Sequence, residues 1–219
     1  MSEYAGELIM REKKGILIVV SGFSGAGKGT LMKKLMQDYD NYALSISATT
    51  RQPRVGEEDG REYFFKTKEE FEKMIARDEL IEYAKYVENY YGTPKQYVME
   101  QLEAGKDVIL EIEIQGARQI KKKFPEAVLV FVTAPSMEML RERLVGRGTE
   151  TAEVIHQRLA RAAQEAEGVD EYDYVLVNDQ LDEAVDRLHG IIQSEHFSMK
   201  RNLDFIHEIQ AQAARFTEE

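Results

Sequence analysis

The hydrophobic positions of this chain form four continuous runs, separated by segments whose apolar residues have helical spacing. A strand that is buried on both faces of a parallel sheet gives such a continuous run instead of an alternation. The runs cover residues 16–20, 108–112, 128–132 and 174–177. The helical segments cover residues 29–38, 95–104, 116–123, 136–146, 151–167 and 180–195. This order predicts an α/β fold with a doubly wound parallel sheet, which binds ligands beyond the carboxyl ends of its strands.

Two stretches interrupt the alternation and are expected to form inserted subdomains. Residues 44–94 contain short β-like pieces among turn and polar residues, which indicates a β-rich insertion. Residues 139–168 are rich in arginine and punctuated by Gly146 and Gly148, which indicates a mobile helical lid. The β-like pieces cover residues 44–47, 63–65 and 86–87. The core is then expected to comprise residues 14–43, 95–138 and 169–195, preceded by an N-terminal extension at 1–13.

The C-terminal tail, residues 196–219, has apolar residues at roughly helical spacing. These residues are Phe197, Leu203, Ile206, Ile209, Ala213 and Phe216. Two interpretations are open: a final helix that packs on the domain, or a contact between subunits. The second interpretation predicts a homo-oligomer formed through the tail.

A glycine-rich loop follows the first predicted strand and opens the first predicted helix. Its sequence is Gly22-Phe23-Ser24-Gly25-Ala26-Gly27-Lys28-Gly29-Thr30. Between a buried strand and a helix, backbone N–H groups of such a loop point at phosphate oxygens, and the helix dipole adds positive charge. We therefore predict a phosphate-binding loop, in which Lys28 reaches the terminal phosphates, and not an ordinary glycine-rich turn.

One position of the loop departs from the usual pattern, because Gly29 stands where serine or threonine normally follows the lysine. Glycine offers no hydroxyl to Mg²⁺. Two arrangements are open: Thr30 takes this role, or phosphates and water hold the metal, as suits an ion that dehydrates reluctantly.

Composition restricts the partners and the compartment. The net charge of the 219 residues is −11, which argues against nucleic acid and against an anionic membrane surface as partners. The chain has no cysteine, so disulfides and thiolate catalysis are excluded and a reducing compartment is favoured. No apolar run approaches the roughly 20 residues of a membrane span. Because no secretory signal pattern is present either, the expected location is the cytoplasm.

Two arginines in the predicted insertion, Arg51 and Arg54, lie three positions apart with the hydroxyls of Ser47, Thr49 and Thr50 just upstream. Arginine suits bidentate recognition of phosphate. A solvated turn with surface arginines would have the same sequence. The phosphate-binding reading gains weight because a phosphoryl acceptor must be held near the loop.

Three carboxylates are candidates for the acceptor side. Glu82 precedes a tyrosine-rich stretch, and a carboxylate there could accept hydrogen bonds from guanine, although the residues alone favour aromatic packing of a small subdomain with a surface glutamate. Glu111 and Glu113 follow the second core strand, and alternation sends both to one face. This position suits Mg²⁺-water binding or contact with the acceptor. The four histidines show no metal-ligand spacing.

Taken together, these motifs resemble those of the bacterial guanylate kinases, nucleoside monophosphate kinases that make GDP from GMP. The resemblance extends over residues 14–195. The matching motifs are the loop Gly22–Thr30, Thr49-Thr50-Arg51-Gln52-Pro53-Arg54 with Gly56-Glu57, Gly60-Arg61-Glu62-Tyr63-Phe64-Phe65, Glu82, Asn89-Tyr90-Tyr91-Gly92-Thr93, Gln115-Gly116-Ala117, Arg143-Leu144 with Gly146-Arg147-Gly148, and Asp173-Tyr174 through Asn178-Asp179.

The resemblance implies roles for individual residues. For GMP they are Ser47, Arg51, Arg54, Tyr63 and Tyr91 at the phosphate, Glu82 and Thr93 at guanine, with Ser47 also near the base, and Glu111 and Glu113 at the acceptor. For ATP they are Ser24, Gly25, Ala26, Gly27, Lys28, Gly29 and Thr30, with Asn178 and Asp179 near the base. The implied catalytic residues are Lys28 and three lid arginines, Arg143, Arg147 and Arg158. Glu113 stands where aspartate is common in the family, and Phe23 where proline is common.

The expected activity is direct in-line transfer of the γ-phosphoryl group of MgATP to GMP, without a covalent enzyme intermediate. One rival is a non-catalytic guanylate-kinase-like module that binds proteins, and the retained Lys28 and lid arginines argue against it. A second rival is a kinase for another monophosphate, which Glu82 and Thr93 disfavour.

Overall fold

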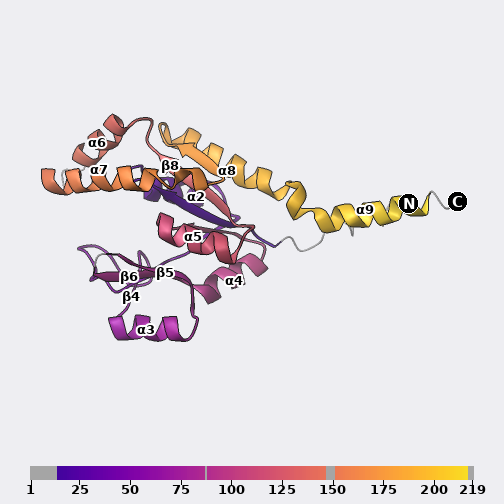
Figure 1. The fold of residues 1–219 in the computed structure, drawn as a ribbon, viewed down its shortest axis with the longest axis horizontal. Coiled ribbons are helices and arrows are strands. Elements are labelled where there is room, and N and C mark those ends of the chain that lie inside the picture. Colours follow the sequence, from indigo (N-terminus) through magenta and orange to yellow (C-terminus); the bar gives the residue numbers. More distant parts are fainter. Residues whose placement is uncertain (1–13, 87, 147–150, 217–219) are drawn as a thin grey trace.

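A computed structural model describes residues 14–86, 88–146 and 151–216. At its centre lies a parallel sheet of five strands in the order β2-β7-β1-β8-β9 (Figure 1). The strands are β1 (Leu17–Gly22), β2 (Tyr42–Leu44), β7 (Asp107–Glu111), β8 (Val128–Thr133) and β9 (Tyr174–Val177). Both neighbours of β1 run parallel to it, as the four apolar runs predict.

The central strands of the sheet are buried on both faces, which explains why they read as continuous apolar runs, whereas Val175 and Val177 of the edge strand β9 are exposed. Ile18 and Val20 of β1 point into one hydrophobic cluster, whereas Leu17 and Val19 point into another on the opposite face. The first cluster is covered by α2 (Lys28–Asp38) and α8 (Leu181–His196), and the second by α4 (Lys95–Glu103) and α5 (Ile114–Lys123). Helices on both faces confirm the doubly wound α/β fold.

The strand β2 is a correction to the sequence analysis. Its three residues pair in parallel with β7, so Leu44 belongs to the central sheet and not to the predicted insertion. The predicted β-piece at 44–47 is wrong beyond Leu44, because Ser45–Ser47 form no strand. Three apolar residues at the edge of a sheet give too short a run to stand out.

A second, smaller sheet has the strand order β4-β3-β6-β5. Its strands are β3 (Ala48–Thr49), β4 (Phe64–Phe65), β5 (Leu80–Tyr86) and β6 (Asn89–Pro94), and β5 and β6 form an antiparallel hairpin. The sequence did not predict α3 (Lys68–Ala76), which packs Phe71 under this sheet against Tyr90. Only one residue of α3 is buried, so its apolar signal is weak. Its capping box, Thr67 with Glu70, was the available clue.

The predicted lid contains two helices, α6 (Met137–Gly146) and α7 (Ala152–Ala166), which lie side by side (Figure 1). Leu140 and Leu144 of α6 and Ala162 of α7 are buried. Arg147 lies outside the described residues.

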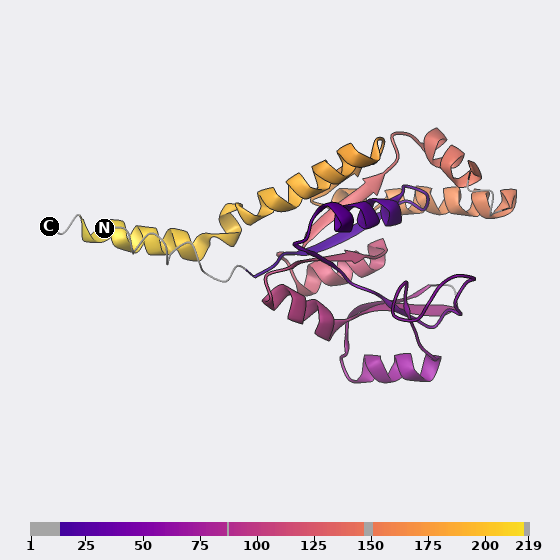
Figure 2. The same ribbon diagram turned by 180° about the vertical axis from the view of Figure 1, so that it is seen from behind.

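After α8 the chain passes through a short 3-10 turn, η2 (Met199–Arg201), into α9 (Leu203–Arg215). Figures 1 and 2 show that α9 extends away from the sheets, and none of its residues is buried. The tail is helical, but the interpretation of a helix that packs on the domain is wrong.

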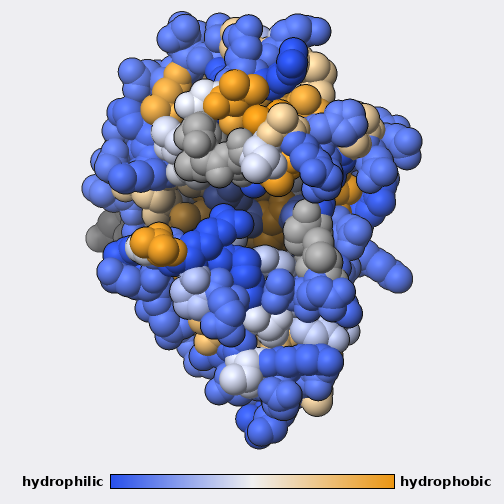
Figure 3. Space-filling model, turned by 90° about the vertical axis from the view of Figure 1, so that its left-hand side faces the viewer, coloured by the Kyte–Doolittle hydropathy of each residue, from blue (hydrophilic) through white to orange (hydrophobic). Residues whose placement is uncertain are grey.

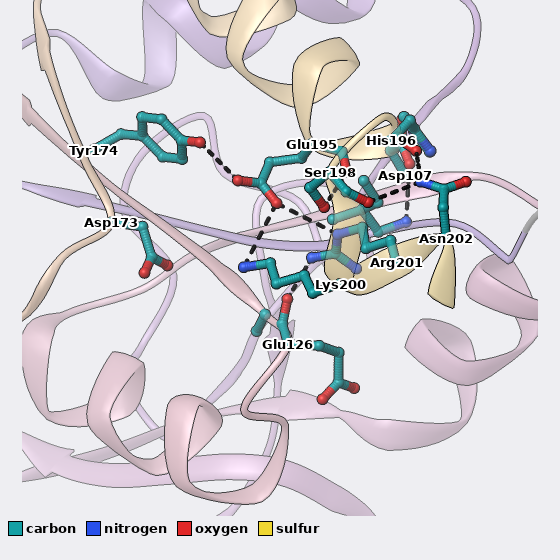
Figure 4. Close-up of polar contacts among 12 residues, drawn as sticks. Asp107, Glu126, Asp173, Tyr174, Glu195, His196, Ser198, Lys200, Arg201 and Asn202 are labelled. Carbon is teal, nitrogen blue, oxygen red and sulfur yellow. Dashed lines mark hydrogen bonds and ion pairs between the residues drawn. The ribbon is translucent and has the colours of Figure 1, made fainter. Parts of the chain in front are cut away.

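Polar contacts hold the joint between α8 and α9 (Figure 4). The buried Glu195 accepts hydrogen bonds from Tyr174 Oη at 2.6 Å and Arg201 Nε at 3.4 Å. His196 Nε2 lies 3.0 Å from Asp107 Oδ2, and Asp107 also accepts a hydrogen bond from the backbone N–H of Ile16. These contacts link the start of the tail to the N-terminal ends of β1 and β7. In the part of the chain that the structure describes, no helix is long and apolar enough to cross a membrane.

Candidate active site

A cleft of about 600 Å³ lies beyond the carboxyl end of β1, between the phosphate loop, the smaller sheet and α7. Figure 3 looks onto the side of the molecule that bears it and shows the surface hollowed between an upper and a lower part. The cleft is lined by Lys28, Arg54, Glu82, Glu111 and Arg158, among others. A second hollow, of about 270 Å³ beside Arg118 and Tyr172, is lined by none of the predicted site residues.

The loop that joins β1 to α2 has the backbone that its glycines permit. Gly25 and Gly27 adopt φ values of 94° and 88°, in the left-handed region that favours glycine. A Cβ on Gly27 would lie 2.6 Å from Asn178 Nδ2, which itself donates a hydrogen bond of 2.8 Å to the carbonyl of Ala26. Through this hydrogen bond, Asn178 stabilises the backbone of the phosphate loop. Its expected place near the ATP base stays a prediction.

Two cations converge on the loop. Lys28 Nζ donates hydrogen bonds to the carbonyls of Gly22, at 2.6 Å, and Phe23, at 3.2 Å. Arg158 reaches over from α7, and its Nη1 contacts Ser24 Oγ. Both side chains line the cleft, where they favour anionic groups.

Other residues predicted for the ATP side lie outside the cleft. Arg143 Nη2 lies 3.7 Å from Met139 Sδ within α6, and Arg143 is not among the lining residues. Thr30 and Asp179 are exposed, and neither lines the cleft. Their roles toward ATP and Mg²⁺ stay predictions.

The predicted acceptor arginines lie near one another but have different surroundings. Arg51 forms an ion pair of 2.9 Å with Glu57 and lies over the ring of Tyr63, 5.3 Å from its centroid. Arg54 lines the cleft, and its backbone N–H donates to Glu57 Oε2 at 2.7 Å. Ser47, Tyr63 and Tyr91 also line the cleft.

Glu82 is the most deeply placed carboxylate of the acceptor side. It is 3% exposed and accepts a hydrogen bond of 2.7 Å from Thr93 Oγ1. Burial raises the pKa of Glu82 to about 7, although Thr93 and the charge of Lys123 act in the opposite direction. A Cβ on Gly116 of α5 would lie 2.8 Å from Glu82 Oε2, so glycine leaves the room that this carboxylate needs.

Glu111 and Glu113 both line the cleft, as alternation predicts. Glu111 ends β7, and burial raises its pKa while the charge of Lys28 lowers it. Glu113 precedes α5 as its N-cap residue, and although its side chain is half exposed, partial desolvation raises its pKa against the opposing effect of Arg161. Among the described residues, no group of three or more His, Cys, Asp or Glu is arranged to hold a metal ion.

Arg161 belongs to the arginine-rich lid, but the family resemblance implies no place for it in the site. In the structure Arg161 lines the cleft, with Gln157 and Glu165 of the same helix. Its Nη2 donates a hydrogen bond of 2.8 Å to Glu113 Oε2, and its Nε donates one of 2.8 Å to Glu165 Oε1. The spacing of Arg161 and Glu165 is a helical pairing signal. No pattern in the sequence predicts the contact between Arg161 and Glu113.

A parallel sheet with a phosphate loop after its first strand, and a cleft that joins this loop to arginines and carboxylates, defines a P-loop nucleotide-binding protein of the phosphotransferase type. The model of the guanylate kinase family matches residues 14–195. The chain therefore belongs to the guanylate kinase family.

Individual relatives agree with this assignment. The chain is 51% identical over 200 residues to the guanylate kinase of Halalkalibacterium halodurans, a match that covers 91% of this chain and 98% of the relative. It is 54% identical over 192 residues to that of Oceanobacillus iheyensis, covering 88% and 93%. The crystal structure of guanylate kinase from Anaplasma phagocytophilum superposes with a TM-score of 0.72 at 32% identity, covering 86% of this chain and 90% of that one.

Proposed function

We propose that this protein is an ATP:GMP phosphotransferase, which makes ADP and GDP. The observation that carries the proposal is a single cleft with a phosphate loop at one end and the buried pair of Glu82 and Thr93 at the other. Relatives at 50–54% identity over about nine-tenths of the chain carry the name guanylate kinase. The non-catalytic alternative is disfavoured, because Lys28 and Arg158 are both present and both face the cleft.

On the donor side, the loop backbone binds the phosphates of ATP, and Lys28 and Arg158 stabilise the charge that spreads over the transferred phosphoryl group. The acceptor phosphate oxygen attacks the γ-phosphorus in line, and the bond to the β,γ-bridging oxygen breaks. The leaving group is ADP, and no covalent enzyme intermediate forms. Catalysis is then positioning plus preorganised charge. Arg143 and Arg147 are proposed to join from the lid.

On the acceptor side, Arg51 and Arg54 bind the phosphate of GMP, with Tyr63 and Tyr91 beside it. The ionised carboxylate of Glu82 accepts hydrogen bonds from N1–H and the amino group of guanine, a donor pair that adenine lacks. Thr93 orients that carboxylate through its hydrogen bond. Ser47 lines the cleft next to these groups.

Mg²⁺ is the proposed cofactor, bound together with ATP. The donor set fits a metal that keeps mostly phosphate and water ligands, because Glu111 lines the cleft, whereas Thr30 in the first turn of α2 is exposed and does not line it. When bound, Mg²⁺ neutralises charge on the β- and γ-phosphates.

We further propose the cytoplasm as the location, since both substrates are intracellular nucleotides, and a homo-oligomer formed through the tail. The second point is supported by the exposed side chains of Leu203, Phe205 and Ile209, which lie on a helix that leaves the body of the protein (Figure 2).

A coupled assay of ADP formation with GMP, AMP, CMP and UMP tests the activity. We expect rapid turnover with GMP and at least tenfold lower kcat/KM with the other three. Equal turnover with AMP would contradict the role given to Glu82. No turnover with GMP would contradict the proposed function.

A further inference from the structure

Arg161 of α7 joins two carboxylates that come from different parts of the molecule. Its Nη2 bonds to Glu113 and its Nε to Glu165, each at 2.8 Å. Glu165 lies one turn further along the same helix, whereas Glu113 starts α5 beneath the central sheet. Arg161 and Glu165 are largely shielded, with side chains 28% and 20% exposed, and Glu113 is 51% exposed. The arginine therefore ties the lid helix to the core.

The contact with Glu165 orients the guanidinium. A planar guanidinium presents its donors in a fixed fork, so a bond from Nε on one edge fixes the direction in which Nη2 points. Glu165 occupies the i+4 position, which places the two side chains on the same face of α7. The pair holds the fork so that Nη2 faces Glu113.

Glu113 has reason to need such a partner. It is the N-cap residue of α5, but its side chain makes no capping hydrogen bond to the helix. It shares the cleft with Glu111, two positions away, and a nucleotide brings further negative charge to the same place. Beyond the effect of desolvation, the negative charge of Glu165 raises the pKa of Glu113 and the charge of Arg161 lowers it, so the arginine offsets this repulsion.

The same helix also contacts the donor side. Arg158 lies three residues before Arg161, hence on the same face of α7, and contacts Ser24 in the phosphate loop. One face of α7 thus carries both Arg158, which contacts the phosphate loop, and Arg161, which contacts Glu113. This arrangement distinguishes Arg161 from a surface ion pair.

We propose that Arg161 is a positioning residue for the phosphoryl acceptor: from α7 it holds the Glu113 carboxylate in the cleft. This inference rests on the proposed function. It predicts a specific defect in the use of GMP, because Glu113 faces the acceptor end, whereas Arg158 and the loop are left in place for ATP.

The test is a double-mutant cycle on the full-length chain with Arg161→Gln, Glu113→Gln and the double variant. We expect Arg161→Gln to raise the KM for GMP about tenfold and the KM for ATP less than threefold. We expect the double variant to be no worse than Glu113→Gln alone, because Arg161 acts through Glu113. Arg161→Lys, which keeps the charge but not the two-sided fork, should give an intermediate KM for GMP.

Arg187→Gln is the matched control. Arg187 forms an ion pair of the same i,i+4 kind with Glu183, at 2.9 Å, on the exposed side of α8 and away from the cleft. It should leave both KM values unchanged. Thermal melting of each variant separates misfolding from a local defect, and if Arg161→Gln fails to fold, the comparison of Arg161→Lys with Glu113→Gln carries the test.

Equal increases in both KM values, or effects of the two single changes that multiply in the double variant, would overturn the proposal. Failure of the proposed function is distinguishable, because it would show as absent GMP turnover in the unmodified protein.

Discussion

Thr93 and Glu82 face each other across the β5–β6 hairpin, and the hydroxyl of Thr93 donates a hydrogen bond of 2.7 Å to the carboxylate of Glu82. Both residues are buried, yet Glu82 still lines the cleft. One of its oxygens is bound to Thr93, and the other lies close to Gly116 of α5. The base-recognition site is thus built where the smaller sheet meets a core helix.

This arrangement predicts a pH dependence of GMP use. Burial raises the pKa of Glu82 to about 7, and only the ionised carboxylate accepts both guanine donors. GMP therefore binds more weakly as the pH falls below 7. We expect the KM for GMP to be about tenfold higher at pH 6 than at pH 8, since about a tenth of Glu82 is ionised at pH 6.

Glu82→Gln is the control for this effect. It should have a high KM for GMP at both values of pH and lose most of the difference between them. The GMP phosphate, which itself titrates near pH 6, contributes equally to both proteins. A profile for the unmodified enzyme that matches that of Glu82→Gln would refute the assignment of Glu82.

The stability of the ligand-free protein should respond to pH with the opposite sign. Because the pKa of Glu82 is raised from 4.5 to about 7 on folding, the folded state holds a proton that the unfolded chain releases within this window. The free energy of unfolding contributed by Glu82 therefore falls as the pH rises from about 4.5 to 7. Denaturant titrations at pH 5 and pH 7.5 should show Glu82→Gln gaining stability relative to the unmodified protein at the higher pH. A relative gain at the lower pH instead would contradict this.

Lys28→Ala should reduce kcat severely in a folded protein. Lys28 faces the cleft from the first turn of α2, and removing one preorganised charge-stabilising group typically costs about 10²–10³ in kcat, or roughly 2.7–4 kcal/mol. Single-turnover kinetics measures the loss, and circular dichroism checks the fold. A folded variant with near-normal kcat would exclude the phosphate-loop mechanism.

Arg54→Ala should weaken the use of GMP more than that of ATP, because Arg54 lines the acceptor part of the cleft. A charge-assisted hydrogen bond contributes roughly 1.5–3 kcal/mol, which corresponds to about a tenfold to hundredfold rise in KM. Arg61→Ala is a suitable comparison, since Arg61 lies nearby but pairs with Glu58 and Glu62 outside the cleft. Steady-state kinetics in which the concentration of each substrate is varied measures both KM values. Equal increases in the KM for GMP and the KM for ATP would contradict the assignment of Arg54 to the acceptor.

Deletion of residues 203–219 should lower the oligomeric mass while turnover per site is largely retained. The deletion removes the exposed apolar side chains of α9 but keeps Arg201, which bonds to Glu195 at the joint (Figure 4). Light scattering of both chains at matched concentration measures the change. A monomeric mass for the full-length chain would show that the tail makes no subunit contact.

The sequence predicted the elements that bury residues on a regular pattern. Four of the five strands of the central sheet are continuous apolar runs, so residues such as Val19 and Val130 marked them directly. Strand β2 and helix α3 were not predicted, because each has too few buried residues to give a recognisable hydrophobic pattern. The extended course of α9 was not predictable either, because an apolar stripe indicates burial without saying against what.

In the candidate site too, contiguous motifs were predictable from the sequence, whereas contacts between distant segments were not. The phosphate loop is contiguous, so its glycine spacing between a predicted strand and a predicted helix was enough to predict it. The contact between Arg161 and Glu113 joins residues 48 positions apart, and only the packing of α7 across the cleft brings them together. Asn178 shows a related limit: its place at the end of β9 was clear, but its hydrogen bond to Ala26 depends on how the loop folds back over the strand.

The central claim is direct transfer of a phosphoryl group from ATP to GMP, and γ-labelled ATP tests it most directly. The labelled ATP is incubated with the enzyme, Mg²⁺ and GMP. The label should appear in GDP in a 1:1 ratio to the ADP formed. Little label should appear in inorganic phosphate, and none should remain on the acid-quenched protein. Label found only in inorganic phosphate, or bound to the protein, would contradict the account.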